Sequence, residues 1–228
     1  MKKAIEDIKT TFISNKDLST VKIADNNEPL VNLKGLDKSI ILETPVENLP
    51  FTGDTIYLRN TVAKKIFRIQ KKLSEKGFGL KIVDGYRPIE IQQQYWKEEL
   101  EKNRINYPSI SEKELEEITS IFIAKPSLSL HPTGGAIDLT IVDSSMKELW
   151  MGTKINEFDE KSYSQHPEVG EEALNNRKIL FELMQEEEFY SLPSEWWHFS
   201  YGTIDWASYY KKQFAIYGIE KLDNERQN

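Results

Sequence analysis

The chain has 228 residues, of which 39% are hydrophobic and 11% aromatic, enough to bury the core of one domain spanning residues 1–228. A net charge of −7 disfavours nucleic acid or an anionic membrane as the main partner, because both require a concentrated positive surface. The absence of cysteine excludes disulfides, thiolate metal ligands and a cysteine nucleophile. Nothing in the composition indicates an obligate protein partner.

The first eight residues begin with lysines, but acidic residues interrupt the apolar run that a signal peptide or a transmembrane helix would need. The sequence therefore predicts a cytoplasmic protein, or a periplasmic one if a leader was removed. Residues 1–50 contain few periodic apolar positions, and we expect an irregular segment that wraps the core, with 31–42 partly extended.

Apolar residues recur at helical spacing in four segments, which are 60–77, 88–103, 111–124 and 171–188. Ser111 and Glu114 form the sequence pattern of a capping box at the start of the third segment. Short apolar or alternating runs predict strands at 80–83, 136–142 and 196–202. The pattern favours an α+β domain with a small, mostly antiparallel sheet flanked by helices.

Two of the three histidines lie in segments suited to binding one zinc ion. His131 is followed by two glycines and then by Asp138 in a predicted strand, and His198 ends the run Glu-Trp-Trp-His. Two imidazoles and a carboxylate leave a fourth zinc position open for water, as catalytic zinc sites require. Glu195 lies three residues before His198, where it could act as a general base without being a ligand.

Each of these residues also has an ordinary interpretation. A single histidine is usually hydrogen-bonded in the fold, and an aspartate near a turn usually accepts from local backbone amides. The joint arrangement favours the zinc site. The third histidine, His166, precedes a proline in a predicted loop, and we expect it at the surface.

A second polar segment, 84–88, reads Asp-Gly-Tyr-Arg-Pro and follows a predicted strand. Arg87 stands at a corner between strand and helix, where its guanidinium could stabilise the oxyanion formed when water attacks a carbonyl. Asp84 could hold the loop or the guanidinium in place. The alternative is an ordinary surface ion pair between the two side chains.

The segments 84–88, 129–138 and 195–198, in this order, resemble the zinc D-alanyl-D-alanine dipeptidases associated with vancomycin resistance. The resemblance runs from Phe51 to beyond His198. Related zinc D,D- and L,D-carboxypeptidases share the metal pattern but tend to have proline directly after the glutamate, where this chain has Trp196. The resemblance implies the zinc peptidase fold shared with Hedgehog signalling domains.

The same resemblance implies roles for individual residues. Zinc would be bound by the two histidines and Asp138, with Glu195 as base and Arg87 as stabiliser of the transition state. Ser129 matches a position near the substrate, and Asp159 resembles the acidic residue that meets the substrate's free amino group. That segment is two residues longer than the family pattern, so Glu157 and Glu160 are competing candidates.

The sequence predicts a zinc-dependent D,D-dipeptidase with a small dipeptide as substrate. The family often has a tyrosine in the segment just before its Phe-Thr-Gly motif, whereas residues 39–44 of this chain contain none. We expect this difference to affect the choice of substrate more than the reaction class. Two alternatives remain. One is a D,D- or L,D-carboxypeptidase acting on peptidoglycan stem peptides, and the other is a zinc-stabilised binding domain without activity.

Overall fold

The computed structural model describes residues 13–120 and 123–222. Its helices and strands, with 3-10 helices marked η, are in chain order α2 (Asn15–Leu18), β1 (Leu30–Asn32), β2 (Ile41–Leu42), η1 (Val46–Asn48), α3 (Leu49–Thr52), β3 (Tyr57–Arg59), α4 (Asn60–Ser74), β4 (Gly79–Asp84), α5 (Ile89–Asn106), α6 (Glu112–Thr119), η2 (His131–Thr133), β5 (Ala136–Val142), η3 (Glu160–Ser162), η4 (Pro167–Val169), α7 (Glu171–Glu186), β6 (Tyr190–Ser191), β7 (His198–Ser200) and α8 (Ile204–Tyr209).

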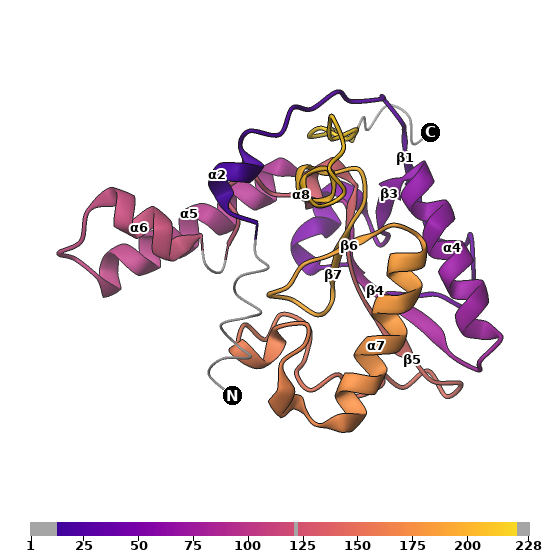
Figure 1. Cartoon of the computed structure of the whole chain (residues 1–228). Helices are drawn as coiled ribbons and strands as arrows, with labels where there is room; N and C mark the ends of the chain where they lie inside the picture. The colour runs from indigo at the N-terminus through magenta and orange to yellow at the C-terminus, as the bar shows by residue number, and fades with distance from the viewer. Residues whose placement is uncertain (1–12, 121–122, 223–228) are drawn as a thin grey trace.

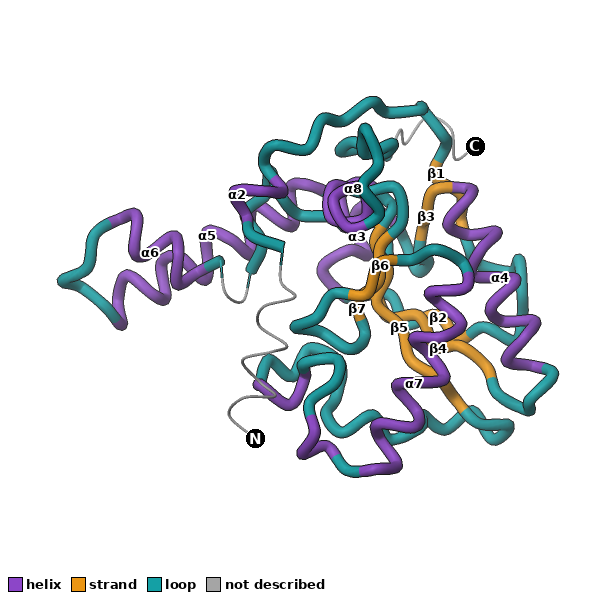
Figure 2. Tube along the Cα trace, in the orientation of Figure 1, coloured by secondary structure: helices purple, strands orange, loops and turns teal. Residues whose placement is uncertain are grey.

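The centre of the fold is a five-stranded sheet in the order β2-β4-β5-β7-β6. Strand β2 runs parallel to β4, and the other neighbouring pairs are antiparallel. A separate two-stranded ribbon joins β1 to β3. Figures 1 and 2 show α4 and α7 beside the sheet, and the α5–α6 hairpin projecting away from it. The predicted α+β class with a small, mostly antiparallel sheet is confirmed.

The two faces of the sheet differ in chemistry because side chains alternate along each strand. In β5, Ile137, Leu139 and Ile141 are fully buried and belong to the same apolar core as residues of α4 and α7. Asp138 and Thr140 therefore point to the opposite face. Helices α4 and α7 cover the apolar face and leave the polar face of β4, β5 and β7 for other groups.

The predicted helices are confirmed with shifted ends. Helix α6 begins with the predicted capping box, in which Ser111 and Glu114 each accept from the other's backbone amide, and it ends earlier than expected at Thr119. Helix α5 begins after Pro88 and extends one turn beyond the predicted end, to Asn106. Gly77 follows α4 with a left-handed φ of 80°, which suits the glycine expected to end that helix.

The predicted strand 196–202 is shorter in the structure, where β7 contains only His198–Ser200. The backbone of Trp196 donates to the carbonyl of Ser162 at 3.0 Å, and the amide of His198 donates to the carbonyl of Glu195 at 3.2 Å. The segment before His198 is therefore a turn. A run of buried aromatic residues gave no sign of this turn in the sequence.

The described part of the N-terminal segment, 13–50, contains only short helices and strands and lies along the rest of the chain. Ile23 forms an isolated parallel bridge with Ala215, and β1 pairs with β3. Residues 1–12 of the predicted wrapping segment lie outside the described residues. The single-domain organisation over 1–228 stays a prediction.

Within the described ranges, no helix has both the length and the apolar character needed to cross a membrane.

A fully buried arginine of β3 connects three segments that are distant in the sequence. Arg59 donates through Nε to the carbonyl of Thr133 at 2.8 Å and through Nη1 to the carbonyl of Glu28. Its guanidinium also forms ion pairs of 3.0 Å with Asp25 and with Glu220. One side chain thereby connects the N-terminal segment, the η2 loop and the C-terminal segment.

Replacing Arg59 with methionine should lower the free energy of unfolding by about 3–5 kcal/mol, because it leaves partly buried carboxylates and carbonyls without their cation. Urea denaturation measures this change. The matched control is Lys34→Met, since the Lys34–Asp54 pair is well exposed and should contribute little. An Arg59→Met protein within about 1 kcal/mol of the wild type would contradict the role given to this arginine.

Candidate metal centre and active site

Three carboxylate and imidazole side chains form one row across three neighbouring strands. Strand pairing places Asp84 of β4 opposite Asp138 of β5, and Asp138 opposite His198 of β7. Directly opposed residues have Cβ atoms about 4.5–5.5 Å apart on the same face. The row lies on the face opposite to the apolar core.

Asp84 reaches this row through an irregularity in β4. Ile82 pairs with Leu139, and the next registered pair is Asp84 with Asp138, so one extra residue, Val83, is inserted. In a regular strand Asp84 would share the face of Leu80 and Ile82, which belong to the apolar core. The bulge moves the carboxylate to the polar face, beside Asp138.

His131 comes from the η2 turn just before β5, and its ring is oriented by a backbone carbonyl. Its Nδ1 lies 2.8 Å from the oxygen of Gly85, so Nδ1 carries the proton and Nε2 is left with a lone pair. Gly134, with a left-handed φ of 70°, ends this turn, and a Cβ there would lie 2.3 Å from Leu30. The glycine is needed for the turn that leads from His131 into β5.

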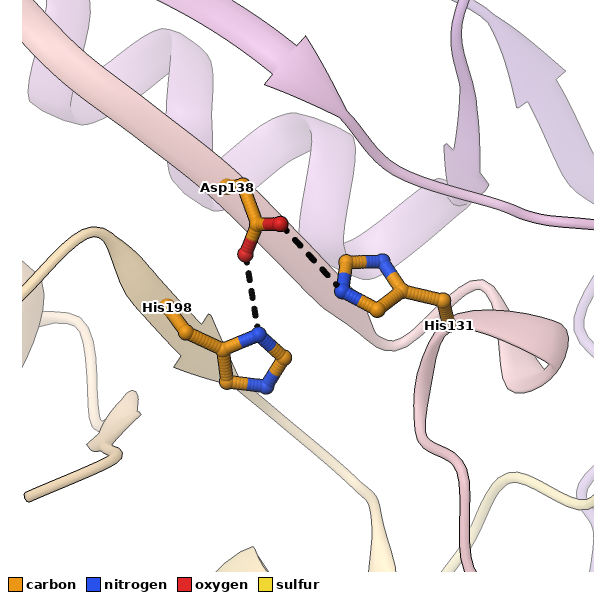
Figure 3. A group of neighbouring side chains, drawn as sticks. All are labelled: His131, Asp138 and His198. Atoms are coloured by element: carbon orange, nitrogen blue, oxygen red, sulfur yellow. Dashed lines mark hydrogen bonds and ion pairs between the residues drawn. The ribbon is translucent and has the colours of Figure 1, made fainter. Parts of the chain in front are cut away.

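The ligand atoms of His131, Asp138 and His198 all lie within 4.8 Å of one another. Figure 3 shows the Asp138 carboxylate between the two imidazole rings, with His198 Nδ1 at 2.9 Å from Oδ1 and His131 Nε2 at 3.5 Å from Oδ2. Bonds of 2.0–2.2 Å to a tetrahedral zinc place neighbouring ligand atoms about 3.3 Å apart. The two observed separations lie on either side of this value, so the donor set fits such an ion.

The charge states of the two histidines also suit a cation. Burial lowers the pKa of His131, which favours the neutral imidazole that a metal requires. Burial opposes the charged form of His198, but the hydrogen bond and charge of Asp138 raise its pKa to about 9. The proton on His198 Nδ1 therefore occupies a position that a metal cation could take. The other nitrogen, Nε2, is buried without a hydrogen-bond partner within the described residues, and it keeps its own proton when the proton on Nδ1 is lost.

Glu195 lies in the turn that precedes β7. Its amide donates to the carbonyl of Leu192 at 3.2 Å, and its own carbonyl accepts from the amide of His198. Glu195 is only partly exposed. Burial raises its pKa to about 7, with Asp138 acting in the same direction and His198 and Arg87 opposing. A carboxyl group with a pKa near neutrality can both accept and donate a proton at physiological pH.

Arg87 follows β4 and is joined to the η2 turn through its backbone amide, which donates to the carbonyl of His131 at 3.3 Å. Its Nε and Nη2 donate to Asp84 Oδ2 at 3.1 and 2.5 Å, and Nη1 donates to Gln92 at 2.8 Å. The guanidinium also lies 5.4 Å from the ring centre of Tyr95. Its side chain is 18% exposed, so this is no ordinary surface ion pair.

The other predicted substrate-binding residues, Ser129 and Asp159, differ in their exposure. Ser129 is buried two residues before His131. Asp159 is exposed and accepts from the amide of Lys161 at 2.8 Å, while Glu157 is exposed and accepts from the amide of Lys154 at 2.9 Å. Glu160 is exposed as well. The structure selects none of the three acids as the partner of a substrate amine.

Arg177 was not among the residues expected from the sequence. It connects the acidic loop, residues 157–160, to the turn that contains Glu195. Arg177 of α7 is 1% exposed and donates to the carbonyls of Met151, Lys161 and Tyr163 at 2.7–2.9 Å. Its guanidinium lies 5.6 Å from the Trp196 ring centre. A signal was present, because Arg177 occupies a position on the same helical stripe as Ala173, Leu180 and Met184.

The expectation that His166 lies at the surface is wrong. The residue is 2% exposed, and its Nδ1 accepts from the amide of Glu168 at 3.2 Å. His166 precedes the short helix η4, whose first turn it caps, so the loop in which it lies is packed against the protein.

Comparison with known proteins agrees with these motifs. The model of peptidase family M15, described as D-ala-D-ala dipeptidase, matches residues 51–217. A D-alanyl-D-alanine dipeptidase of Enterococcus faecalis is 33% identical over 144 residues, covering 60% of this chain and 69% of the relative. One of Synechocystis is 26% identical over 226 residues, covering 87% of this chain and 92% of the relative.

Among solved structures, the LD-carboxypeptidase LdcB superposes with a TM-score of 0.49 at 18% identity, over 89% of this chain and 86% of that one. The match of the family model covers most of the chain and includes all three motifs. This chain belongs to the D-alanyl-D-alanine dipeptidase family of metallopeptidases.

Proposed function

We propose that this protein is a zinc-dependent D,D-dipeptidase that hydrolyses D-alanyl-D-alanine or a related short dipeptide. The observation that carries the proposal is the convergence of three ligand atoms within 4.8 Å, beside a glutamate with a pKa near 7 and an arginine held by two side chains. The family to which the chain belongs gives the substrate class, since the matched relatives are named D-alanyl-D-alanine dipeptidases.

His131, Asp138 and His198 would hold one zinc ion per chain, and they are the one cluster of this kind in the described part of the chain. The ion would polarise the scissile carbonyl and lower the pKa of a water molecule. Two imidazoles and one carboxylate are a suitable donor set for catalytic zinc. Within the protein, Gly85 fixes the tautomer of His131.

Glu195 takes the proton from the attacking water and delivers it to the nitrogen of the leaving D-alanine, so that the carboxyl group returns to its starting state. Burial raises the pKa of this carboxyl group, which makes it a better acceptor for the proton of the water. Arg87 donates to the carbonyl oxygen as that oxygen gains negative charge. Asp84 holds the guanidinium in place for this contact.

Substrate recognition requires partners for the two charged ends of a free dipeptide. Ser129 would contact the substrate beside His131, and Asp159 would bind its ammonium group, with Glu157 and Glu160 as the other candidates on the same loop. Phe158 of this loop packs edge-on against Trp197, with 6.0 Å between ring centres. The loop that carries the acids therefore lies beside the turn that carries Glu195. The cellular compartment and the absence of other partners stay predictions.

The direct test is release of D-alanine from D-alanyl-D-alanine and from its N-acetylated form by zinc-loaded protein. We expect rapid release from the free dipeptide alone, because acetylation removes the ammonium group that a carboxylate of this loop would bind. Chelation should abolish release, and zinc should restore it. Release from both substrates would instead indicate a carboxypeptidase. Release from neither, with zinc bound, would favour another dipeptide as substrate or a binding domain.

The role of Glu195 predicts that Glu195→Gln retains zinc but loses on the order of 10²- to 10⁴-fold in kcat, because an amide of the same shape cannot accept the proton. Steady-state kinetics with metal analysis of the same preparation measures both. Glu182→Gln, at an exposed glutamate of α7, is the matched control and should leave kcat unchanged. Normal turnover by Glu195→Gln would exclude Glu195 as the base.

A further inference from the structure

Asn48, at the end of η1, has a buried side chain of which only one half is used. The residue is 2% exposed, and its Nδ2 donates to Asp84 Oδ1 at 3.3 Å. Its Oδ1 is buried with no hydrogen-bond partner within the described residues. A buried carbonyl oxygen without a partner destabilises a fold, and an apolar side chain of similar size would avoid this cost. The asparagine is therefore better explained by what its NH₂ group does.

That NH₂ group fixes the rotation of the Asp84 carboxylate. Oδ1 of Asp84 accepts from Asn48 and, at 2.8 Å, from the amide of Gly85. Oδ2 accepts from Nε and Nη2 of Arg87. The two oxygens therefore have separate partners. Asn48 and Gly85 hold the carboxylate from one side, and the other side is directed at Arg87.

The guanidinium held in this way keeps donors available for a substrate. A guanidinium has five N–H groups. Asp84 accepts from two of them, Gln92 accepts from a third, and the ring of Tyr95 lies 5.4 Å from the guanidinium carbon. One N–H on each terminal nitrogen remains for an incoming oxygen, as far as the described residues show. A change in the angle of Asp84 would turn these remaining donors.

We infer that Asn48 is a positioning residue for Arg87, acting through the carboxylate of Asp84. This inference rests on the proposed function, in which Arg87 stabilises the oxygen that gains charge. Such an interaction is made in the transition state and hardly in the bound substrate, so weakening it lowers kcat more than it changes KM. The unpaired oxygen of Asn48 is a local cost accepted for the position of Arg87.

The first experiment compares Asn48→Leu with the wild type in kinetics and in thermal unfolding. We expect kcat to fall about tenfold, a part of the 10²- to 10³-fold loss that follows removal of an oxyanion donor, with KM changed less than about twofold. The unfolding midpoint should stay the same or rise, because the unpaired oxygen is gone. A purely structural role predicts instead that the midpoint and the activity fall together, and that result would overturn the inference.

The matched control is Asn103→Leu. Asn103 is also a buried asparagine, 6% exposed, and its Nδ2 donates to Thr119 in the α5–α6 hairpin. Its replacement should leave kcat unchanged. A second variant at the site, Asn48→Asp, keeps the shape of the side chain and puts an acceptor against Asp84 Oδ1, so it should lower kcat at least as much as leucine does. Wild-type kcat in Asn48→Asp would contradict the inference even if the leucine variant fails to fold.

A double-mutant cycle tests the path through Asp84. If Asn48 acts through this carboxylate, the kcat of Asp84→Asn combined with Asn48→Leu equals that of Asp84→Asn alone. Multiplied losses would show that Asn48 acts independently and would overturn the inference.

A readout without turnover separates this inference from the proposed function. The ¹⁵N–¹H signal of Arg87 Nε should shift or broaden in Asn48→Leu, and an unchanged signal would contradict the inference. This spectrum can be recorded even if the wild type and Asn103→Leu both fail to cleave D-alanyl-D-alanine, a failure that would count against the proposed function alone.

Discussion

The site depends above all on the register of three antiparallel strands. Asp84, Asp138 and His198 occupy one row because β4, β5 and β7 pair at these residues. A slip of one residue would turn each side chain to the apolar face and place Ile137 or Phe199 in the row instead. The buried aliphatic residues on the other face, packed under α4 and α7, oppose such a slip. The apolar core therefore determines the position of polar residues that it does not contact.

The groups that do not come from this row are fastened to it by buried polar contacts. His131 is oriented by Gly85 from the end of β4, and the loop after it is held by Arg59. On the other side, Arg177 fastens the acidic loop to Trp196, next to Glu195. Both arginines donate mainly to backbone carbonyls, so they set the path of loops that have little regular secondary structure. The result is a His131–Asp138–His198 cluster with paired strands beneath it and loops around it that are held by buried hydrogen bonds.

The sequence was sufficient to predict four of the helices (α4, α5, α6 and α7), the central strand β5 and the grouping of His131, Asp138 and His198, but not the short helices α2, α3 and α8. Apolar periodicity predicts secondary structure well in long segments such as α4 and β5. Two histidines and one aspartate in this pattern predict a zinc site because they are suitable zinc ligands. The bulge at Val83 was not predictable, because its one-residue insertion is visible only in the pairing of β4 with β5. Asn48 and Gln92 were missed for a similar reason. The partner of Asn48, Asp84, is distant in the sequence, and Gln92 lies on α5 whereas its partner Arg87 lies outside that helix. Asp159 remains a prediction whose test is kinetic.

The central claim is that His131, Asp138 and His198 form one zinc site. Anomalous diffraction at the zinc absorption edge, from crystals of the zinc-loaded protein, tests it most directly. We expect a single strong peak within about 2.0–2.2 Å of His131 Nε2, of a carboxylate oxygen of Asp138 and of a ring nitrogen of His198. A peak elsewhere on the protein, or a bound ion that lacks any one of these three residues as a ligand, would contradict the account.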